Sequence, residues 1–166
     1  LFGYAHLLLR STMGKPWVRC GVAMSPEDVE EYEGFVYIIT NTVNNKRYIG
    51  KKRFWFKKAK KPLKGKKKRR ISYVPSDWQD YYGSSPALLE DVEKYGKDAF
   101  TREIIHLCKT TGEMNYWEGK LQYQHRVLEL PDEWYNEWII VKISRSHLPK
   151  SYFSNTETVS LIDDDQ

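Results

Sequence analysis

The chain of 166 residues is long enough for one domain, and its 40% apolar and 14% aromatic residues can form a core, which excludes a disordered protein. Its formal net charge is +5, yet residues 51–70 hold 13 lysines and arginines and no acidic residue, so the rest of the chain carries −8. This distribution predicts a polyanionic partner on one face, and the absence of any apolar run of membrane-spanning length argues against a membrane protein.

The ends of the chain differ from its middle. Residues 1–9 lack the basic start and the small-residue cleavage site of a signal peptide. Cys20 and Cys108 lie far apart, in no metal-binding spacing, which is typical of reduced thiols in a cytoplasmic protein. Ser25 and Pro26, followed by acidic residues, predict the start of a helix. We expect an extension over residues 1–24, a domain over 25–148 and a polar, acidic tail over 149–166.

Residues 35–50 have the pattern of a β-hairpin. Residues 35–41 are β-branched and aromatic, Asn44 and Asn45 are typical of a tight turn, and residues 46–50 return as a second strand. Tyr37 lies on the first strand and Tyr48 on the second. An antiparallel pairing through the Asn turn would bring both tyrosines onto one face.

A basic insert over residues 51–73 follows the hairpin. Pro62 and Gly65 interrupt any helix or strand that would cover it all, so we expect a loop. Its density of charge favours contacts with nucleic-acid phosphates, although a solvated face or a localisation signal is the alternative. The residues expected to contact DNA are Lys51, Lys52, Lys64, Lys66, Lys67, Lys68, Arg69 and Arg70.

Two helices and two further extended segments complete the predicted domain. A helix begins after Ser85 and stops at Gly96, and residues 100–107 form a third strand. A second helix begins near Thr110 and ends at Pro131, and residues 134–143 are a last strand or extended segment. This order predicts an α/β or α+β sandwich, with a small, mostly antiparallel, three-stranded sheet flanked by helices.

Several of these residues resemble the motifs of the GIY-YIG nuclease family. Phe35-Val36-Tyr37 is similar to the first motif with Phe in place of Gly, and Tyr48-Ile49-Gly50, eleven residues after Tyr37, matches the second. The resemblance extends over residues 34–143 and includes the stretch 94–100. The relatives it suggests are free-standing, phage-type homing endonucleases of the Seg kind.

The resemblance implies a GIY-YIG nuclease fold and Mg²⁺- or Mn²⁺-dependent hydrolysis of DNA phosphodiester bonds. Glu118, 22 residues after Gly96, falls where the family carries its metal-binding Glu, and a hydrated Mg²⁺ needs few carboxylates. Tyr37 would be the general base, with its pKa lowered by the nearby lysines. Tyr48 would orient water or phosphate, and Asn136 would support the site.

The family's phosphate-stabilising arginine has no clear counterpart. The matching position holds Lys58, and Arg53, Arg69 or Arg70 are the other candidates. A lysine lacks the bidentate geometry of a guanidinium group. This departure leaves open a nucleic-acid-binding module that has the same fold but has lost catalysis. A structural RNA-binding or ribosome-associated protein would explain the basic insert, but not the placement of the tyrosines and Glu118.

Overall fold

The computed structural model describes residues 14–61, 64–65, 70–141, 143–148 and 150–153. A five-stranded sheet in the order β2-β1-β7-β3-β4 forms its centre, and all its neighbouring strands are antiparallel except β1 and β7. The strands of this sheet are β1 (Trp17–Arg19), β2 (Val22–Ala23), β3 (Gly34–Asn41), β4 (Arg47–Arg53) and β7 (Phe100–Cys108). The mixed α/β content agrees with the predicted fold class.

The predicted count of three strands is too small, because residues before 25 join the sheet. Strand β1 pairs with β7 and turns back into β2. Trp17 is buried, packs edge-on against Phe35 and Tyr37 with ring centroids 5.0 Å apart, and donates its indole N–H to the carbonyl of Trp78 at 2.7 Å. A segment set apart as an extension therefore supplies two strands and a core side chain.

The hairpin of β3 and β4 confirms the predicted turn. Asn45 adopts a positive φ of 60°, and the side chain of Asn44 accepts a hydrogen bond from the backbone N–H of Lys46. Strand β4 continues to Arg53, three residues beyond the predicted end at Gly50, because its pairing with β3 continues to Gly34.

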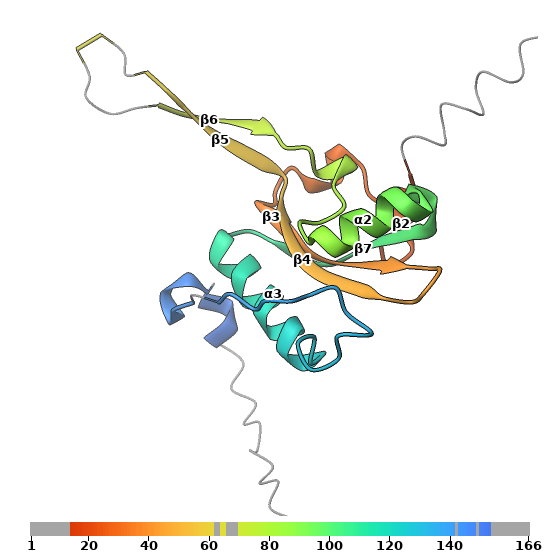
Figure 1. Ribbon diagram of the computed structural model, residues 1–166. Helices are drawn as coiled ribbons and strands as arrows, with labels where there is room; N and C mark the ends of the chain where they lie inside the picture. The colour runs from red at the N-terminus through yellow and green to blue at the C-terminus, as the bar shows by residue number, and fades with distance from the viewer. Residues whose placement is uncertain (1–13, 62–63, 66–69, 142, 149, 154–166) are drawn as a thin grey trace, which may run out of the picture.

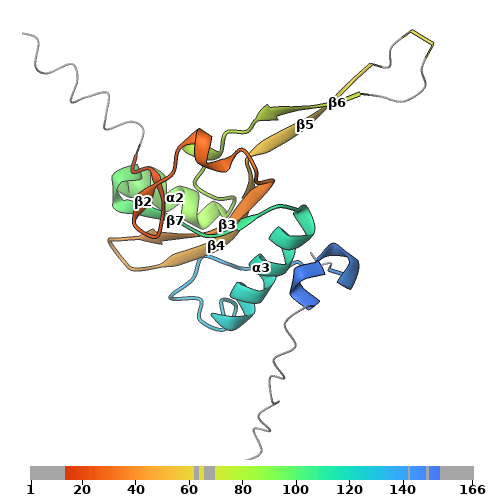
Figure 2. The same ribbon diagram turned by 180° about the vertical axis from the view of Figure 1, so that it is seen from behind.

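The basic insert forms a second hairpin rather than the expected loop. Strands β5 (Trp55–Lys60) and β6 (Arg70–Pro75) pair with each other in a separate two-stranded sheet. In Figures 1 and 2 this hairpin projects away from the body of the protein. Strand β5 ends before Pro62 and β6 begins after Gly65, the two residues predicted to interrupt a regular element. The described residues do not include Pro62, Lys66, Lys67, Lys68 and Arg69.

Helices cover both faces of the five-stranded sheet, with α2 on one side and α3 on the other (Figure 1). Ser85 and Thr110 cap them as predicted. Helix α3 ends earlier than Pro131, because His125 is its C-cap and Arg126 adopts a φ of 53°. The helical segments are η1 (Pro26–Val29), η2 (Trp78–Asp80), α2 (Pro86–Tyr95), η3 (Lys97–Ala99), α3 (Thr111–Gln124), η4 (Arg145–His147) and η5 (Lys150–Phe153).

Residues 134–141 form no helix or strand, and their first residue, Trp134, lies beside β4, where it makes a parallel bridge with Arg47. The chain thus passes the edge of the sheet before it returns to α3. Within the described part of the chain, none of the helices has the length and apolarity required to cross a bilayer.

Candidate active site

A pocket of about 600 Å³ opens at the edge strand β4. It brings together residues from β3, β4, α3 and the extended segment after α3. Its lining residues are Tyr37, Tyr48, Lys51, Ser84, Ser85, Pro86, Glu118, Gln122, Tyr135, Asn136, Glu137, Trp138 and Ile140. Tyr37, Tyr48, Glu118 and Asn136 are four of the six residues predicted to be catalytic, and they are far apart in sequence.

Gly50 leaves space for the Tyr37 side chain to reach the pocket at the edge strand β4. It pairs with Tyr37 across the strands, and Tyr37 and Tyr48 share one face, with ring centroids 6.2 Å apart. A Cβ atom at Gly50 would lie 2.5 Å from the hydroxyl oxygen of Tyr37 and 2.8 Å from the Tyr48 ring. Only glycine therefore leaves room for the Tyr37 hydroxyl at the edge of β4.

Tyr37 is buried among other aromatic rings. Its side chain is 1% exposed, and Tyr81 packs edge-on against it. Burial raises the pKa of Tyr37 well above its usual value, and the neighbouring Tyr48 and Tyr81 act in the same direction. The expectation that nearby lysines lower this pKa is therefore wrong, because desolvation of the phenolate dominates.

Tyr48 is less enclosed than Tyr37. Its hydroxyl lies 3.2 Å from the Ser84 hydroxyl, in the turn just before α2. Burial raises the pKa of Tyr48, and the hydrogen bond with Ser84 opposes that shift. Both tyrosines are consequently neutral at physiological pH, and both can offer a hydroxyl group to a bound water or phosphate.

Glu118 enters the pocket from the opposite face, on α3. It lies one helical turn after the buried Met114 and one turn before Gln122, which donates to the carbonyl of Ile49. The Glu118 side chain is 14% exposed and its Oε2 atom lies 2.5 Å from the Lys51 Nζ atom. Burial raises the pKa of Glu118, and Lys51 partly offsets that shift. Lys51, predicted as a DNA contact, is the ion-pair partner of Glu118 at the pocket.

Asn136 fastens the extended segment to β4. Its side-chain oxygen accepts from the Ile49 N–H at 2.9 Å, and its amide nitrogen donates to the Ile49 carbonyl at 2.8 Å. On the same edge, the N–H of Arg47 donates to Glu133 and the N–H of Tyr135 donates to the Arg47 carbonyl. These two bonds join Asn136 to the second motif, whereas its supporting role in the site stays a prediction.

Two buried polar groups fix the surrounding elements. The Tyr135 hydroxyl donates to Asp91 on α2 at 2.6 Å and accepts from the Asn41 side chain on β3 at 2.9 Å. The Arg102 guanidinium, on β7, donates to the carbonyls of Gln79 and Tyr81 at 2.7 and 3.0 Å. Arg102 therefore holds the segment between β6 and α2, which carries Ser84 to the pocket and packs Tyr81 against Tyr37.

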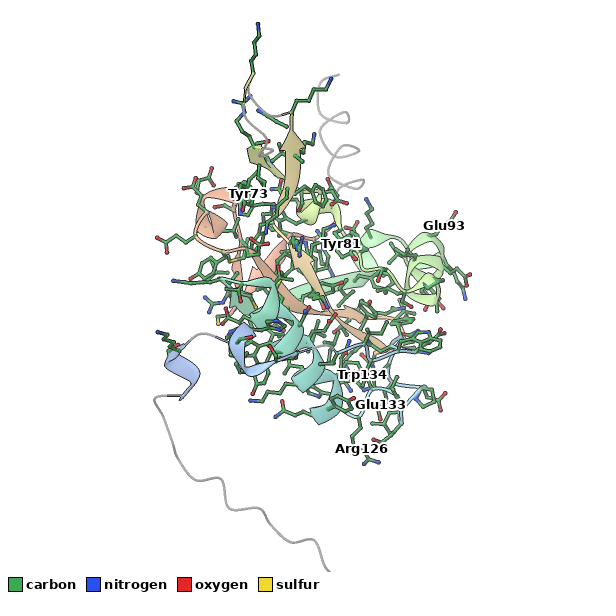
Figure 3. All side chains as sticks on the ribbon, turned by 90° about the vertical axis from the view of Figure 1, so that its left-hand side faces the viewer. Tyr73, Tyr81, Glu93, Arg126, Glu133 and Trp134 are labelled. Atoms are coloured by element: carbon green, nitrogen blue, oxygen red, sulfur yellow. The ribbon has the colours of Figure 1, made fainter. Side chains whose placement is uncertain are left out.

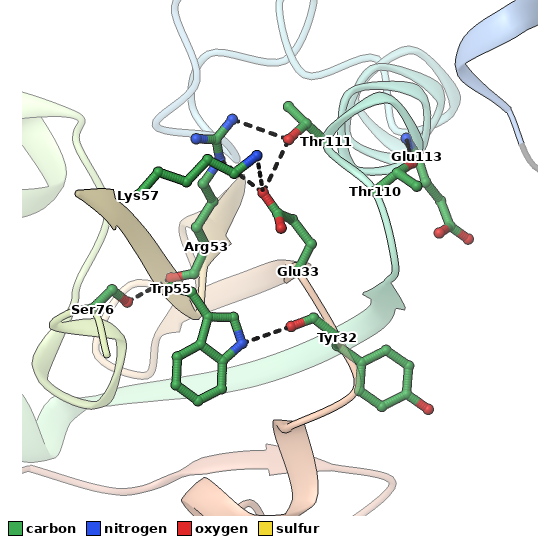
Figure 4. Close-up of polar contacts among 9 residues, drawn as sticks. All are labelled: Tyr32, Glu33, Arg53, Trp55, Lys57, Ser76, Thr110, Thr111 and Glu113. Atoms are coloured by element: carbon green, nitrogen blue, oxygen red, sulfur yellow. Dashed lines mark hydrogen bonds and ion pairs between the residues drawn. The ribbon is translucent and has the colours of Figure 1, made fainter. Parts of the chain in front are cut away.

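The structure does not bring Arg53 or Lys58 to the pocket. Arg53 bonds Thr111 and, with Lys57, faces the Glu33 carboxylate at 3.8 and 3.7 Å, as Figure 4 shows. Lys58 is exposed on β5, opposite Ser72. Among the residues that the structure describes, Lys51 is the only cationic side chain that lines the pocket.

The other predicted DNA contacts divide into two kinds. Lys52 is packed against the body, because its Nζ atom lies 2.6 Å from Asp77 Oδ1 and 3.8 Å from the centroid of the Tyr81 ring. Lys64 and Arg70 are exposed on the projecting hairpin. Side chains with nitrogen at their tips gather around the far end of this hairpin in Figure 3.

The pocket has few groups with which to hold a metal ion. Glu118 and Glu137 are its acidic residues, and the described residues include no group of three His, Cys, Asp or Glu side chains arranged around a metal. A hydrated Mg²⁺ keeps several water ligands and needs only one or two carboxylates. The donor set therefore fits an ion anchored mainly by Glu118.

Several pocket residues were not predicted from the sequence. Ser84 belongs to residues 77–85, whose aromatic and turn-forming composition suggests no particular role. Gln122 shares a helical face with Glu118, so the four-residue spacing was an available signal. Glu137 carries no such signal, because its position depends on contacts between distant segments.

Comparisons with known proteins identify the family of the chain. The family described as "Putative endonuclease segE, GIY-YIG domain" matches residues 17–139. "Putative endonuclease segE" of Enterobacteria phage T4 is 31% identical over 88 residues, which cover 52% of this chain and 33% of that protein. The alignment therefore spans about a third of that relative. No solved structure matches the chain.

Proposed function

Because the chain belongs to the GIY-YIG endonuclease family, we propose that it hydrolyses phosphodiester bonds of DNA at the pocket beside β4. The convergence of Tyr37, Tyr48 and Glu118 from three separate elements is the observation that carries this proposal. Tyrosine hydroxyl groups can orient an attacking water, and a buried carboxylate can hold the cation that such chemistry requires.

We assign Tyr37 to the attacking water. Its hydroxyl reaches the pocket over Gly50, and as a neutral phenol it can accept a hydrogen bond from water and orient it. The role of general base, which the resemblance implies, requires a positive charge to offset the burial that raises the pKa of Tyr37. Tyr48, with its hydroxyl beside Ser84, is placed to contact a phosphate oxygen.

Lys51 is the cation that we assign to the phosphate, in place of Arg53 and Lys58. It lines the pocket, whereas Arg53 is engaged with Glu33 and Thr111 at the base of the hairpin. Its ammonium group can follow the charge that develops on the phosphate oxygens. A divalent ion bound at Glu118 would supply Lewis-acid stabilisation of the same group.

The β5–β6 hairpin is the proposed contact with the DNA backbone. Its described cations include Lys58, Lys60, Lys64 and Arg70, all exposed. Each strand has six residues and, at about 3.3 Å per residue, extends roughly 20 Å from the body. Phosphate contacts of this kind supply affinity and orientation rather than sequence selection.

A cleavage assay with matched variants tests the proposal. Purified protein is incubated with supercoiled plasmid, with Mg²⁺ or with chelator, beside Glu118→Gln and Glu93→Gln. Glu93 is an exposed glutamate on α2 and serves as the control for the loss of one carboxylate (Figure 3). We expect metal-dependent cutting by the wild type and Glu93→Gln, and a loss of at least about 100-fold in Glu118→Gln.

A second outcome would support the binding module instead. The ion pair between Lys51 and Glu118 favours this candidate, because the ammonium group already satisfies the carboxylate. Tight binding of plasmid without cutting, equal in the wild type and in Glu118→Gln, would overturn the nuclease.

A further inference from the structure

Residues 137–141 form the outer rim of the pocket. Trp138 is 75% exposed and Ile140 is 81% exposed, and both line the pocket. The side chains that alternate with them contact the body of the protein. Ile139 packs against the core cluster that includes Met114 of α3. Val141 lies against Gly119 of α3, because a Cβ added to Gly119 would lie 2.6 Å from the Val141 side chain. An extended chain points successive side chains in opposite directions, so this anchoring directs Trp138 and Ile140 outward.

Trp138 differs from the other tryptophans of the chain. The chain has six, all within the described residues, and the remaining five are buried or half-buried. An exposed indole beside an exposed isoleucine on a fixed segment marks a binding surface. The surface is continuous with the pocket that holds Tyr37, Glu118 and Lys51, so whatever covers it also reaches the pocket.

We propose that Trp138, supported by Ile140, stacks on a nucleobase that is unstacked from the duplex beside the cleaved phosphodiester. The inference rests on the proposed function, which places that phosphate in the pocket. A base is joined to its phosphate through one sugar, so it lies near the rim when the phosphate is inside. An indole stacks on any base, and an aliphatic side chain can wedge between base steps.

The chemistry of the rim favours a base over a protein partner. Lys51 lines the same pocket and the exposed cations of the β5–β6 hairpin lie on the same molecule, so a polyanion is attracted to it. The preferred substrate is therefore DNA with a locally unpaired base, such as a single-nucleotide bulge. A fully paired duplex has to be distorted first, which opposes its binding.

Equilibrium binding tests this inference without requiring cleavage. A labelled duplex and the same duplex with one unpaired nucleotide are titrated with protein in chelator, by fluorescence anisotropy. We expect the wild type to prefer the bulged DNA. Trp138→Ala should weaken binding of the bulged DNA by at least about five-fold and abolish the preference, whereas Trp138→Phe should keep most of it.

The control is Tyr123→Ala, which removes an exposed aromatic ring from α3 outside the pocket and should bind both DNAs as the wild type does. Unchanged binding by Trp138→Ala, or an equal loss for both DNAs, would overturn the stacking role. A change in oligomeric state in Trp138→Ala, measured by light scattering, would show that the rim is a protein interface and would also overturn it. Because binding is measured in chelator, a protein that never cuts DNA would still give a result.

Discussion

The pocket lies beside strand β4, and the β5–β6 hairpin begins where β4 ends. The two regions are nevertheless stabilised in opposite ways. Asn136 lines the pocket and Arg102 lies on the neighbouring strand β7, and both buried side chains are satisfied by backbone atoms of distant segments. In the hairpin, the side chains beyond Phe56 on β5 are exposed, and the charges are carried into solvent. The proposed chemistry thus lies in a part of the fold with many buried hydrogen bonds, and the proposed electrostatic attraction lies in a part with little packing.

The largest expected effect comes from Arg102 on the pocket side. Arg102→Met removes a buried guanidinium group that donates to the part-buried carbonyls of Gln79 and Tyr81. We expect a loss of about 2–4 kcal/mol in the free energy of unfolding. Urea denaturation followed by tryptophan fluorescence measures it. Arg126→Met, at an exposed arginine after α3, should stay within about 0.5 kcal/mol.

Gly50→Ala tests whether the space above Gly50 is needed for Tyr37 and Tyr48 to reach the pocket. The added methyl group collides with the Tyr37 hydroxyl and the Tyr48 ring, so the rings must move. We expect a destabilisation of about 1–3 kcal/mol together with a loss of DNA cleavage. Gly21→Ala, at a positive φ but with no atom within 4 Å of the added Cβ, shows the cost of backbone strain without a collision, so it separates the two causes of destabilisation. Full cleavage by Gly50→Ala would contradict this account of the pocket.

Substitutions in the hairpin should separate binding from stability. The triple variant Lys58→Gln, Lys60→Gln and Arg70→Gln should bind DNA more weakly. The slope of log affinity against log salt is negative, and its magnitude should decrease by about 2–3. Its free energy of unfolding should change by less than about 0.5 kcal/mol, because these side chains are exposed.

The matched control removes three exposed charges elsewhere, by substitution of Lys94, Lys109 and Arg126 with Gln. An equal reduction of the salt slope in both triple variants would show that net charge, rather than the hairpin, determines binding.

The smallest expected effect is a change in pH dependence. Burial raises the pKa of Glu118, and Lys51 lowers it. Cleavage that needs the carboxylate is lost as the pH falls through this pKa. In Lys51→Met the opposing cation is gone, so the pKa rises further and the acidic limb of the remaining cleavage rate should move to higher pH. Rate measurements from pH 5 to 9 check it, with Lys94→Met as the control. An acidic limb at the same pH in Lys51→Met and in the wild type would show that Lys51 does not lower the pKa of Glu118.

Local sequence signals predicted the elements whose contacts are themselves local. The Asn44 turn and the Ser85 and Thr110 caps each depend on atoms a few residues away. Strands β1 and β2 have three and two residues and exist through pairing with β7 and with each other. No local pattern reveals strands of that length.

Two further misses have separate causes. Strands β5 and β6 contain aromatic and β-branched residues, but the charge of the insert together with Pro62 and Gly65 favoured a loop. The end of α3 depends on a left-handed Arg126, where the sequence has no glycine to signal it.

The candidate site was predictable in its motif residues and not in their environment. The resemblance to the family's motifs identified Tyr37, Tyr48, Glu118 and Asn136, and the structure brings them to one pocket. The pairing of Lys51 with Glu118 requires α3 to pack beside β4, and the raised pKa of Tyr37 requires the rings that enclose it. Both depend on tertiary burial, which spacing along a chain does not contain.

Asn136 also affects how this protein meets other copies of itself. Strand β4 is the outer strand of the sheet, and an unpaired outer strand is a template on which another chain can add a strand. The Asn136 amide bonds both backbone groups of Ile49, as a neighbouring peptide unit would. With Arg47 already bonded on the same edge, this side chain protects the sheet against aggregation while it shapes the pocket.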